Sequence, residues 1–204
     1  KLVYAILTGF PIAFMIFAGL SEVAFYNLWI LVIYVSLRLL FSRSKLTRRS
    51  FFYSIFLIVV SLGVGLSLAA IQLLPTYELT QNSIRSAGFP ESSSRIISLS
   101  VKQTIAFVLP HFFGGAMDST YWAPGVFWAM CGYVGIIPLF LAGYAVIKRR
   151  NIFTTIFVII ALFSLLYAFG NHSFLFNVIH QHLPMAKYFR TPVRFLYIFS
   201  FSAA

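Results

Sequence analysis

Acidic residues are scarce in this 204-residue chain, which has four Asp and Glu residues against fifteen Lys and Arg residues and a formal net charge of +11. Charged residues of both signs make up only 9% of the chain, whereas apolar residues make up 60%. Apolar runs of about twenty residues are typical of transmembrane helices. Because backbone groups in hydrocarbon must be paired within the span, such runs indicate helices. The sequence therefore predicts an all-α, polytopic transmembrane helical bundle.

Cysteine is almost absent as well, since Cys131 is the single one and lies within an apolar run. One cysteine excludes an intrachain disulfide and a metal cluster held by thiolates. Among the four histidines, His180 and His182 are two residues apart, but neither an HExxH motif nor a nearby carboxylate accompanies them. We therefore expect no metal site and no cofactor. The GxSxG motif of serine hydrolases is also missing.

Five apolar segments are long enough to be full spans: residues 2–18, 23–41, 51–74, 125–147 and 152–169. A truncated sixth span follows Arg194. Basic residues without acids cluster in residues 42–50 and 148–151, which the positive-inside rule makes cytoplasmic loops. The positive net charge is therefore explained by membrane topology, and we expect no nucleic acid as a partner. Residues 75–124 and 171–194 then lie outside the cytoplasm. We predict a single transmembrane domain (residues 1–204) of a multi-pass protein in a bacterial cytoplasmic membrane.

The ends of the chain suggest a piece of a longer protein. The chain begins at Lys1 without a methionine, and its last apolar run stops after about ten residues, which is too short to cross a membrane. We expect an internal fragment, with some functional residues outside it.

Short helices at the outer membrane surface are expected in both extracytoplasmic intervals. Ser100 and Gln103 have the spacing of a capping box, and an apolar helical face lies opposite Lys102 and Gln103 (Ile97, Val101, Ile105 and Val108). A second amphipathic helix is expected over residues 173–182.

Proline and glycine residues mark helix ends and close contacts. Each of Pro75, Pro110 and Pro184 is predicted to follow the end of a helix, because the residue before proline disfavours the α conformation. Gly63 and Gly65 in the third span are expected to let another helix approach closely.

An arginine motif lies at the start of the last apolar run, in the segment FRTPVRF at residues 189–195. If Pro192 begins a helix, Arg190 and Arg194 lie about one turn apart near its N-terminus, where an anion is favoured. Two guanidinium groups can bind a phosphate or diphosphate through paired hydrogen bonds. The alternative is that both side chains extend to lipid headgroups.

Three acids are candidate bases for an acceptor hydroxyl on the outer side: Glu22, Glu78 and Asp118. Glu22 occupies a predicted four-residue turn (residues 19–22) between two spans. The alternative for each acid is a solvated position or a structural ion pair, for which Arg85 and Arg95 are available. The aromatic residues of this region are expected at the membrane interface rather than in a sugar-stacking site (Tyr121, Trp122 and Trp128).

Four segments in this order resemble bacterial YfhO-like membrane proteins: residues 70–85 (AIQLLPTYELTQNSIR), 109–115 (LPHFFGG), 132–143 (GYVGIIPLFLAG) and 189–196 (FRTPVRFL). That family resembles the GT-C class of membrane glycosyltransferases. The turn at residues 19–28 is similar to a turn of the family, with Ser21 and Glu22 in place of its usual Pro-Gln.

The resemblance implies transfer of a sugar, with inversion, from a polyprenyl-phosphate carrier to an envelope glycopolymer or lipid acceptor outside the cytoplasm. It implies that Arg190, Arg194 and His111 contact the carrier phosphate, and that Glu22, Glu78 or Asp118 lines the acceptor side. It also implies that the principal catalytic loop lies outside this chain. Membrane lipids are expected as further partners of the protein. Two alternatives remain, a transporter or flippase for a lipid-linked sugar and a non-catalytic assembly subunit.

Overall fold

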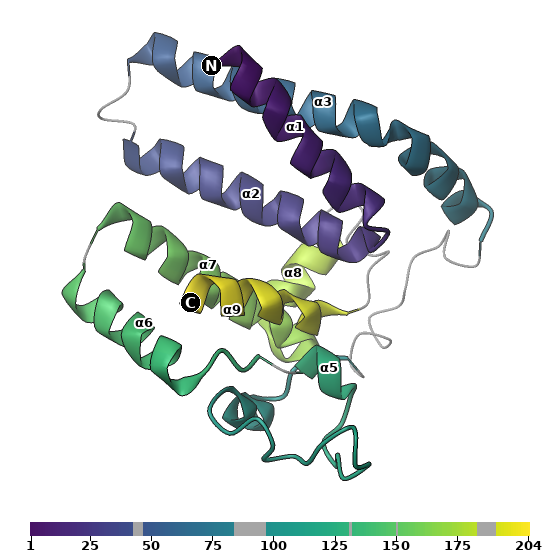
Figure 1. The fold of residues 1–204 in the computed structure, drawn as a ribbon, viewed down its shortest axis with the longest axis vertical. Coiled ribbons are helices and arrows are strands. Elements are labelled where there is room, and N and C mark those ends of the chain that lie inside the picture. The colour runs from purple at the N-terminus through teal and green to yellow at the C-terminus, as the bar shows by residue number, and fades with distance from the viewer. Residues whose placement is uncertain (43–46, 84–96, 131, 150, 183–190) are drawn as a thin grey trace. The chain divides into compact units, whose positions relative to one another are not determined.

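The computed structural model describes residues 1–42, 47–83, 97–130, 132–149, 151–182 and 191–204 (Figure 1). Over these residues every regular element is a helix, which confirms the all-α class. The chain divides into two compact units, Lys1–Ala87 and Gly88–Ala204. The first contains α1 (Leu2–Phe17), α2 (Ser21–Ser42) and α3 (Arg48–Gln81). The elements of the second are η2 (Val101–Phe107), α5 (Phe127–Met130), α6 (Ile136–Lys148), α7 (Ile152–Ala168), η3 (Gly170–His172), α8 (Phe174–His182), η5 (Pro192–Phe195) and α9 (Leu196–Ala203).

Two of the described helices, α2 and α3, are long and apolar enough to cross a membrane. They have 22 and 34 residues, whereas a span needs about 20. The other apolar helices are shorter, with 16 residues in α1, 13 in α6 and 17 in α7. The predicted count of five full spans is therefore not supported.

The predicted fourth span, residues 125–147, is interrupted. Helix α5 ends at Met130, and α6 begins only at Ile136. Gly135 before α6 has a φ of 104°, a value that L side chains rarely adopt and that stops a continuous helix. Glycine at this position therefore explains why apolarity alone gave the wrong helix length.

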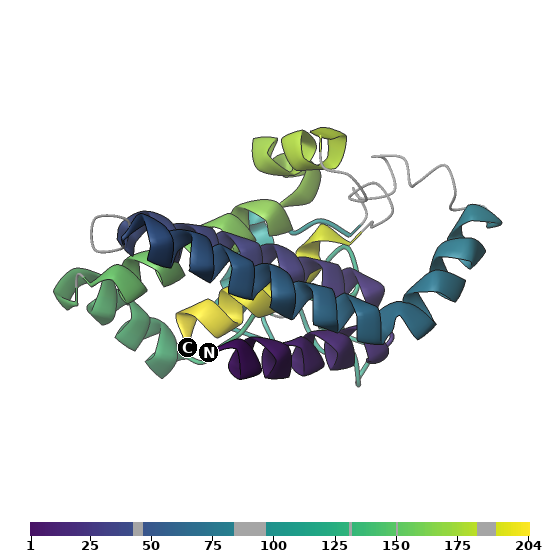
Figure 2. The ribbon, with the colours of Figure 1, turned by 90° about the horizontal axis from the view of Figure 1, so that it is seen from above.

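Pro75 does not end the third helix, as was predicted, but lies inside α3, which continues to Gln81. Proline has no N–H to donate to the carbonyl four residues earlier, and such a gap commonly bends a helix without ending it. Figure 2 shows α3 curving over its C-terminal turns. The Thr76 hydroxyl donates a hydrogen bond of 2.7 Å to the Gln72 carbonyl in the same region, which gives this part of the helix an additional bond.

Helices α1 and α3 pack closely through two glycines. A Cβ atom at Gly65 would lie 2.7 Å from the Ile12 Cβ and 2.9 Å from the Gly9 carbonyl oxygen. A Cβ atom at Gly9 would lie 2.8 Å from the Val64 Cβ. The prediction of a close approach is confirmed at Gly65 but not at Gly63, around which nothing lies within 4 Å. Small side chains at the crossing let the backbones meet.

In the second unit, α7 packs along α9 and η5 (Figure 1). The C-terminal end of α7 is joined to the start of η2, because the Leu99 N–H donates a 3.0 Å hydrogen bond to the Ala168 carbonyl. At Gly170, which has a φ of 55°, a Cβ atom would collide with the Ser98 side chain and lie 3.0 Å from Pro192. Residues from three segments that are distant in the sequence therefore meet at this glycine.

Both segments for which surface helices were predicted are helical, although one has a different geometry. The Ser100 and Gln103 capping box is confirmed, but it starts the 3₁₀ helix η2 and not an α-helix. Val101 and Val108 are exposed, as expected for a face toward lipid, whereas Gln103 is buried because its amide donates to the Pro124 carbonyl. Helix α8 confirms a helix over most of residues 173–182, and its place at the membrane surface stays a prediction. Helix η2 ends before Pro110, as predicted, whereas Pro184 lies outside the described residues.

Candidate functional site

The loop of residues 111–121 in the second unit holds Asp118 in a network of hydrogen bonds. The Thr120 hydroxyl donates to Asp118 Oδ1 at 2.7 Å, and the Thr120 N–H approaches the same oxygen at 3.3 Å. The Gly115 N–H donates to Thr120 Oγ1 at 3.0 Å, and the Tyr121 N–H donates to the Gly115 carbonyl at 3.1 Å. Asp118 is therefore held on one oxygen, and neither bond from Thr120 uses Oδ2.

The two glycines of this loop make room for the network. Gly114 has a φ of 84°, and a Cβ atom there would collide with the backbone of Thr120. At Gly115 a Cβ atom would lie 2.8 Å from Asp118 Oδ1. The Gly-Gly pair thus lets the chain turn tightly, since a side chain at Gly114 would displace Thr120 and a side chain at Gly115 would displace Asp118.

The hydrogen bonds from Thr120 lower the pKa of Asp118 below 3.8, and the nearby His111 contributes in the same direction. Hydrogen bonds to the charged form favour ionisation. Because the pKa is lower in the folded loop, these bonds stabilise the loop above pH 3.8 and are lost as the pH falls through the lowered pKa. Asp118 is therefore an anion at neutral pH.

We expect Thr120→Val to raise the pKa of Asp118 toward 3.8, because valine keeps the shape of threonine but removes the strongest hydrogen bond. Carbodiimide reacts with protonated carboxyl groups, so labelling of Asp118 read by mass spectrometry against pH would show a midpoint at higher pH in the variant. Thr104→Val is the matched control, since the Thr104 hydroxyl donates to the Val101 carbonyl in η2. An unchanged midpoint in Thr120→Val would contradict the role given to Thr120.

Arg194 lies in η5, where Pro192 occupies the first turn, as the sequence predicted. Its neighbours Val193 and Phe195 are buried, and the Phe195 ring lies 4.4 Å from that of Tyr167 between centroids. Arg194 itself is half-buried. The packing of these two neighbours fixes the backbone of Arg194, so the direction in which its side chain leaves the helix is defined. Arg190 lies outside the described residues, and the spacing of the two arginines remains a prediction.

Asp118 and Arg194 belong to the same compact unit, Gly88–Ala204. Contacts connect the loop that holds Asp118 with the helix that holds Arg194. The Gln103 amide of η2 donates a hydrogen bond to the carbonyl of Pro124, which follows the loop, and η5 packs against α5, the next helix after the loop. The Phe107 ring of η2 also stacks on Phe199 of α9 at 5.2 Å between centroids. The loop and the arginine are therefore held by one set of packed elements.

The other two candidate acids belong to the first unit. Glu22 lies in the first turn of α2 and not in the predicted turn of residues 19–22, because α2 already begins at Ser21. Its Oε1 accepts a hydrogen bond of 2.9 Å from the buried Tyr26 hydroxyl. Acids in a first turn are favoured by the helix dipole. Glu78 lies in the last turns of α3, with an exposed side chain. Within the described part of the second unit, the structure brings His111 close enough to Asp118 to lower the pKa of that carboxyl group.

Thr120, which donates two hydrogen bonds to the candidate base Asp118, was not predicted from the sequence as part of the site. The signal was the pair Asp118 and Thr120 two residues apart after a Gly-Gly pair, a spacing typical of a side chain that binds a nearby backbone N–H. As for metals, the described part of the chain brings no group of three or more His, Cys, Asp or Glu residues together.

Comparison with known proteins found no matching family model, no matching curated protein and no matching solved structure.

Proposed function

We propose that this protein transfers a sugar from a polyprenyl-phosphate carrier to a hydroxyl group of a cell-envelope acceptor on the outer side of the membrane. The observation that carries the proposal is the ionised Asp118, held by Thr120 in the same compact unit as Arg194. The resemblance of residues 189–196 and three earlier segments to YfhO-like and GT-C proteins supplies the substrate class.

In the proposed reaction, the acceptor hydroxyl attacks the anomeric carbon from the face opposite the carrier phosphate. The new carbon–oxygen bond forms as the bond to the phosphate oxygen breaks, so the configuration inverts. Asp118 takes the hydroxyl proton. Because a carboxylate with a lowered pKa is a weak base, it takes the proton late, when bond formation has made the acceptor oxygen acidic.

The leaving group is the polyprenyl phosphate, whose negative charge grows as the sugar–oxygen bond breaks. A guanidinium next to that oxygen stabilises the transition state more than the ground state. Arg194 is assigned this role, because its position is fixed by packed neighbours and it lies in a first helical turn. Arg190 and His111 are proposed as further contacts to the phosphate.

The test uses the full-length protein in liposomes that contain polyprenyl phosphate carrying a radiolabelled hexose, with loss of label from the carrier as the measurement. Loss that requires Asp118 and Arg194 would support transfer. Movement of intact, labelled carrier between leaflets would instead indicate a flippase and would overturn the assignment of Asp118 as a base.

Arg194→Lys is expected to lower the transfer rate by about 10- to 100-fold, since one charge-assisted hydrogen bond of a bidentate pair contributes about 1.5–3 kcal/mol. Lysine keeps the charge but loses the planar fork. The matched control is Arg149→Lys, after the end of α6 in the predicted cytoplasmic loop, which is expected to keep the wild-type rate. Equal rates in the two variants would contradict phosphate binding by Arg194.

A further inference from the structure

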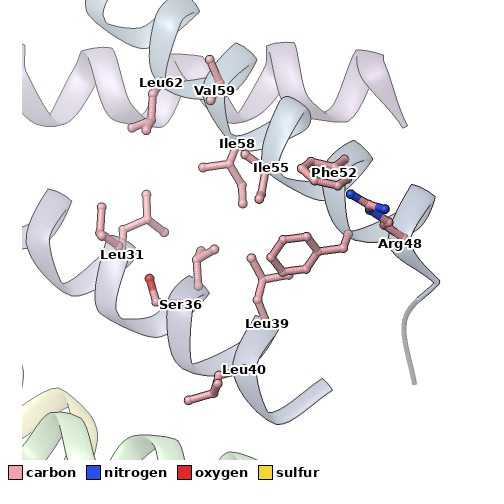
Figure 3. Close-up of a pocket in the computed structure, with 13 residues that line it drawn as sticks. Leu31, Ser36, Leu39, Leu40, Arg48, Phe52, Ile55, Ile58, Val59 and Leu62 are labelled. Carbon is pink, nitrogen blue, oxygen red and sulfur yellow. The ribbon is translucent and has the colours of Figure 1, made fainter. Parts of the chain in front are cut away.

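A large apolar groove separates α2 from α3 in the first unit, at the end where α2 finishes and α3 begins (Figure 3). Its volume is about 940 Å³, which is at the upper end of the range for ligand pockets. Of the residues that line it, only Ser36 and Arg48 are polar. Several of the apolar lining residues stay exposed, including Phe52 at 57% and Val59 at 60%.

The groove runs along one face of α3. Arg48, Phe52, Ile55, Val59 and Leu62 are spaced by three or four residues and therefore share a side of the helix. The rise of 1.5 Å per residue gives a length of about 21 Å from the first of these residues to the last. One leaflet contributes about half of a hydrocarbon core of ~30 Å. The groove is therefore long enough to hold an acyl chain over the full depth of one leaflet.

The described residues give the mouth of the groove a positive charge. Arg48 lies in the first turn of α3, with its guanidinium carbon 6.0 Å from the centre of the Phe52 ring. None of the described acids, Glu22, Glu78 and Asp118, is among the residues that line the groove. Thr47 caps the helix by accepting a hydrogen bond from the Ser50 N–H, and this bond orders the first turn, which contains Arg48. Figure 3 shows Arg48 at one end of the apolar side chains.

We propose that this groove binds one anionic phospholipid of the cytoplasmic leaflet, with an acyl chain along α3 and the phosphate on Arg48. Basic pockets between membrane helices on the cytoplasmic side recognise anionic headgroups. A guanidinium matches a phosphate by paired hydrogen bonds, and the stacked Phe52 ring holds it at the level of the headgroups. The groove uses none of the residues assigned to the proposed transfer reaction.

The test is native mass spectrometry of the purified full-length protein with phosphatidylglycerol and with phosphatidylcholine. We expect one phosphatidylglycerol to remain bound under conditions that remove phosphatidylcholine. Arg48→Ala should lower the affinity for phosphatidylglycerol about tenfold, as expected for the loss of a charge-assisted contact. Arg49→Ala is the matched control, because Arg49 is the next residue of the same helix but does not line the groove.

A second variant tests the acyl chain separately from the charge. Val59→Trp fills the groove without altering Arg48, and it should abolish photo-crosslinking of phosphatidylglycerol that carries a photoactivatable acyl chain to peptides of α2 and α3. Equal loss of binding in Arg48→Ala and Arg49→Ala would show general surface attraction and overturn the proposal. Unchanged crosslinking in Val59→Trp, or a protein helix found in the groove, would overturn it as well.

Discussion

Asp118→Asn is expected to lower the rate of sugar transfer by about 10²- to 10⁴-fold, the usual contribution of a general base. Asparagine has nearly the same size, and its Oδ1 can still accept the hydrogen bonds from the Thr120 hydroxyl and N–H. The loop should therefore keep its shape while it loses the negative charge and the proton acceptor. The measurement is release of radiolabelled hexose from polyprenyl phosphate by the full-length protein in liposomes.

Glu22→Gln and Glu78→Gln are the comparison variants for this prediction, because these are the other two candidate acids. Glu22 already accepts a hydrogen bond from Tyr26, which gives it a structural role. We expect both variants to transfer sugar at the wild-type rate. Normal transfer by Asp118→Asn, together with loss in either glutamate variant, would show that the base is one of the other two acids.

Local signals in the sequence predicted local structure well. The capping box of Ser100 and Gln103 and the helix start at Pro192 are both present. Each depends on hydrogen bonds or fixed dihedral angles within a few residues, so the pattern contains the information needed. The close approach at Gly65 was predicted for the same reason, because a missing side chain is visible in the sequence.

Features that depend on distant residues, or on a backbone conformation that composition does not reveal, were not predictable in this way. The interruption between α5 and α6 was missed because residues 125–147 are apolar throughout, and the positive φ of Gly135 is not visible in composition. Gln103 was placed on the polar face of its helix, although it is buried by its bond to Pro124, 21 residues later. Gly65 packs against Gly9 and Ile12 of α1. The sequence did not indicate which helix would approach Gly65.

The crossing of α1 and α3 gives the largest expected effect on stability. Gly65→Ala places a Cβ atom 2.7 Å from Ile12 and 2.9 Å from the Gly9 carbonyl oxygen, which is backbone and has no rotamer to change. The two helices must therefore move apart. Overpacking of this kind costs about 1–3 kcal/mol. We expect the free energy of unfolding of the full-length protein in detergent, followed by circular dichroism, to fall by that amount.

Gly63→Ala is the matched control two residues earlier in the same helix, where nothing lies within 4 Å of the added methyl group. Alanine favours the helix over glycine by up to about 1 kcal/mol, so this variant should be as stable as the wild type or more stable. The two substitutions make the same chemical change and share any effect on helix propensity. Their difference therefore measures the contact with α1, and equal stability of the two variants would mean that α1 does not pack against Gly65.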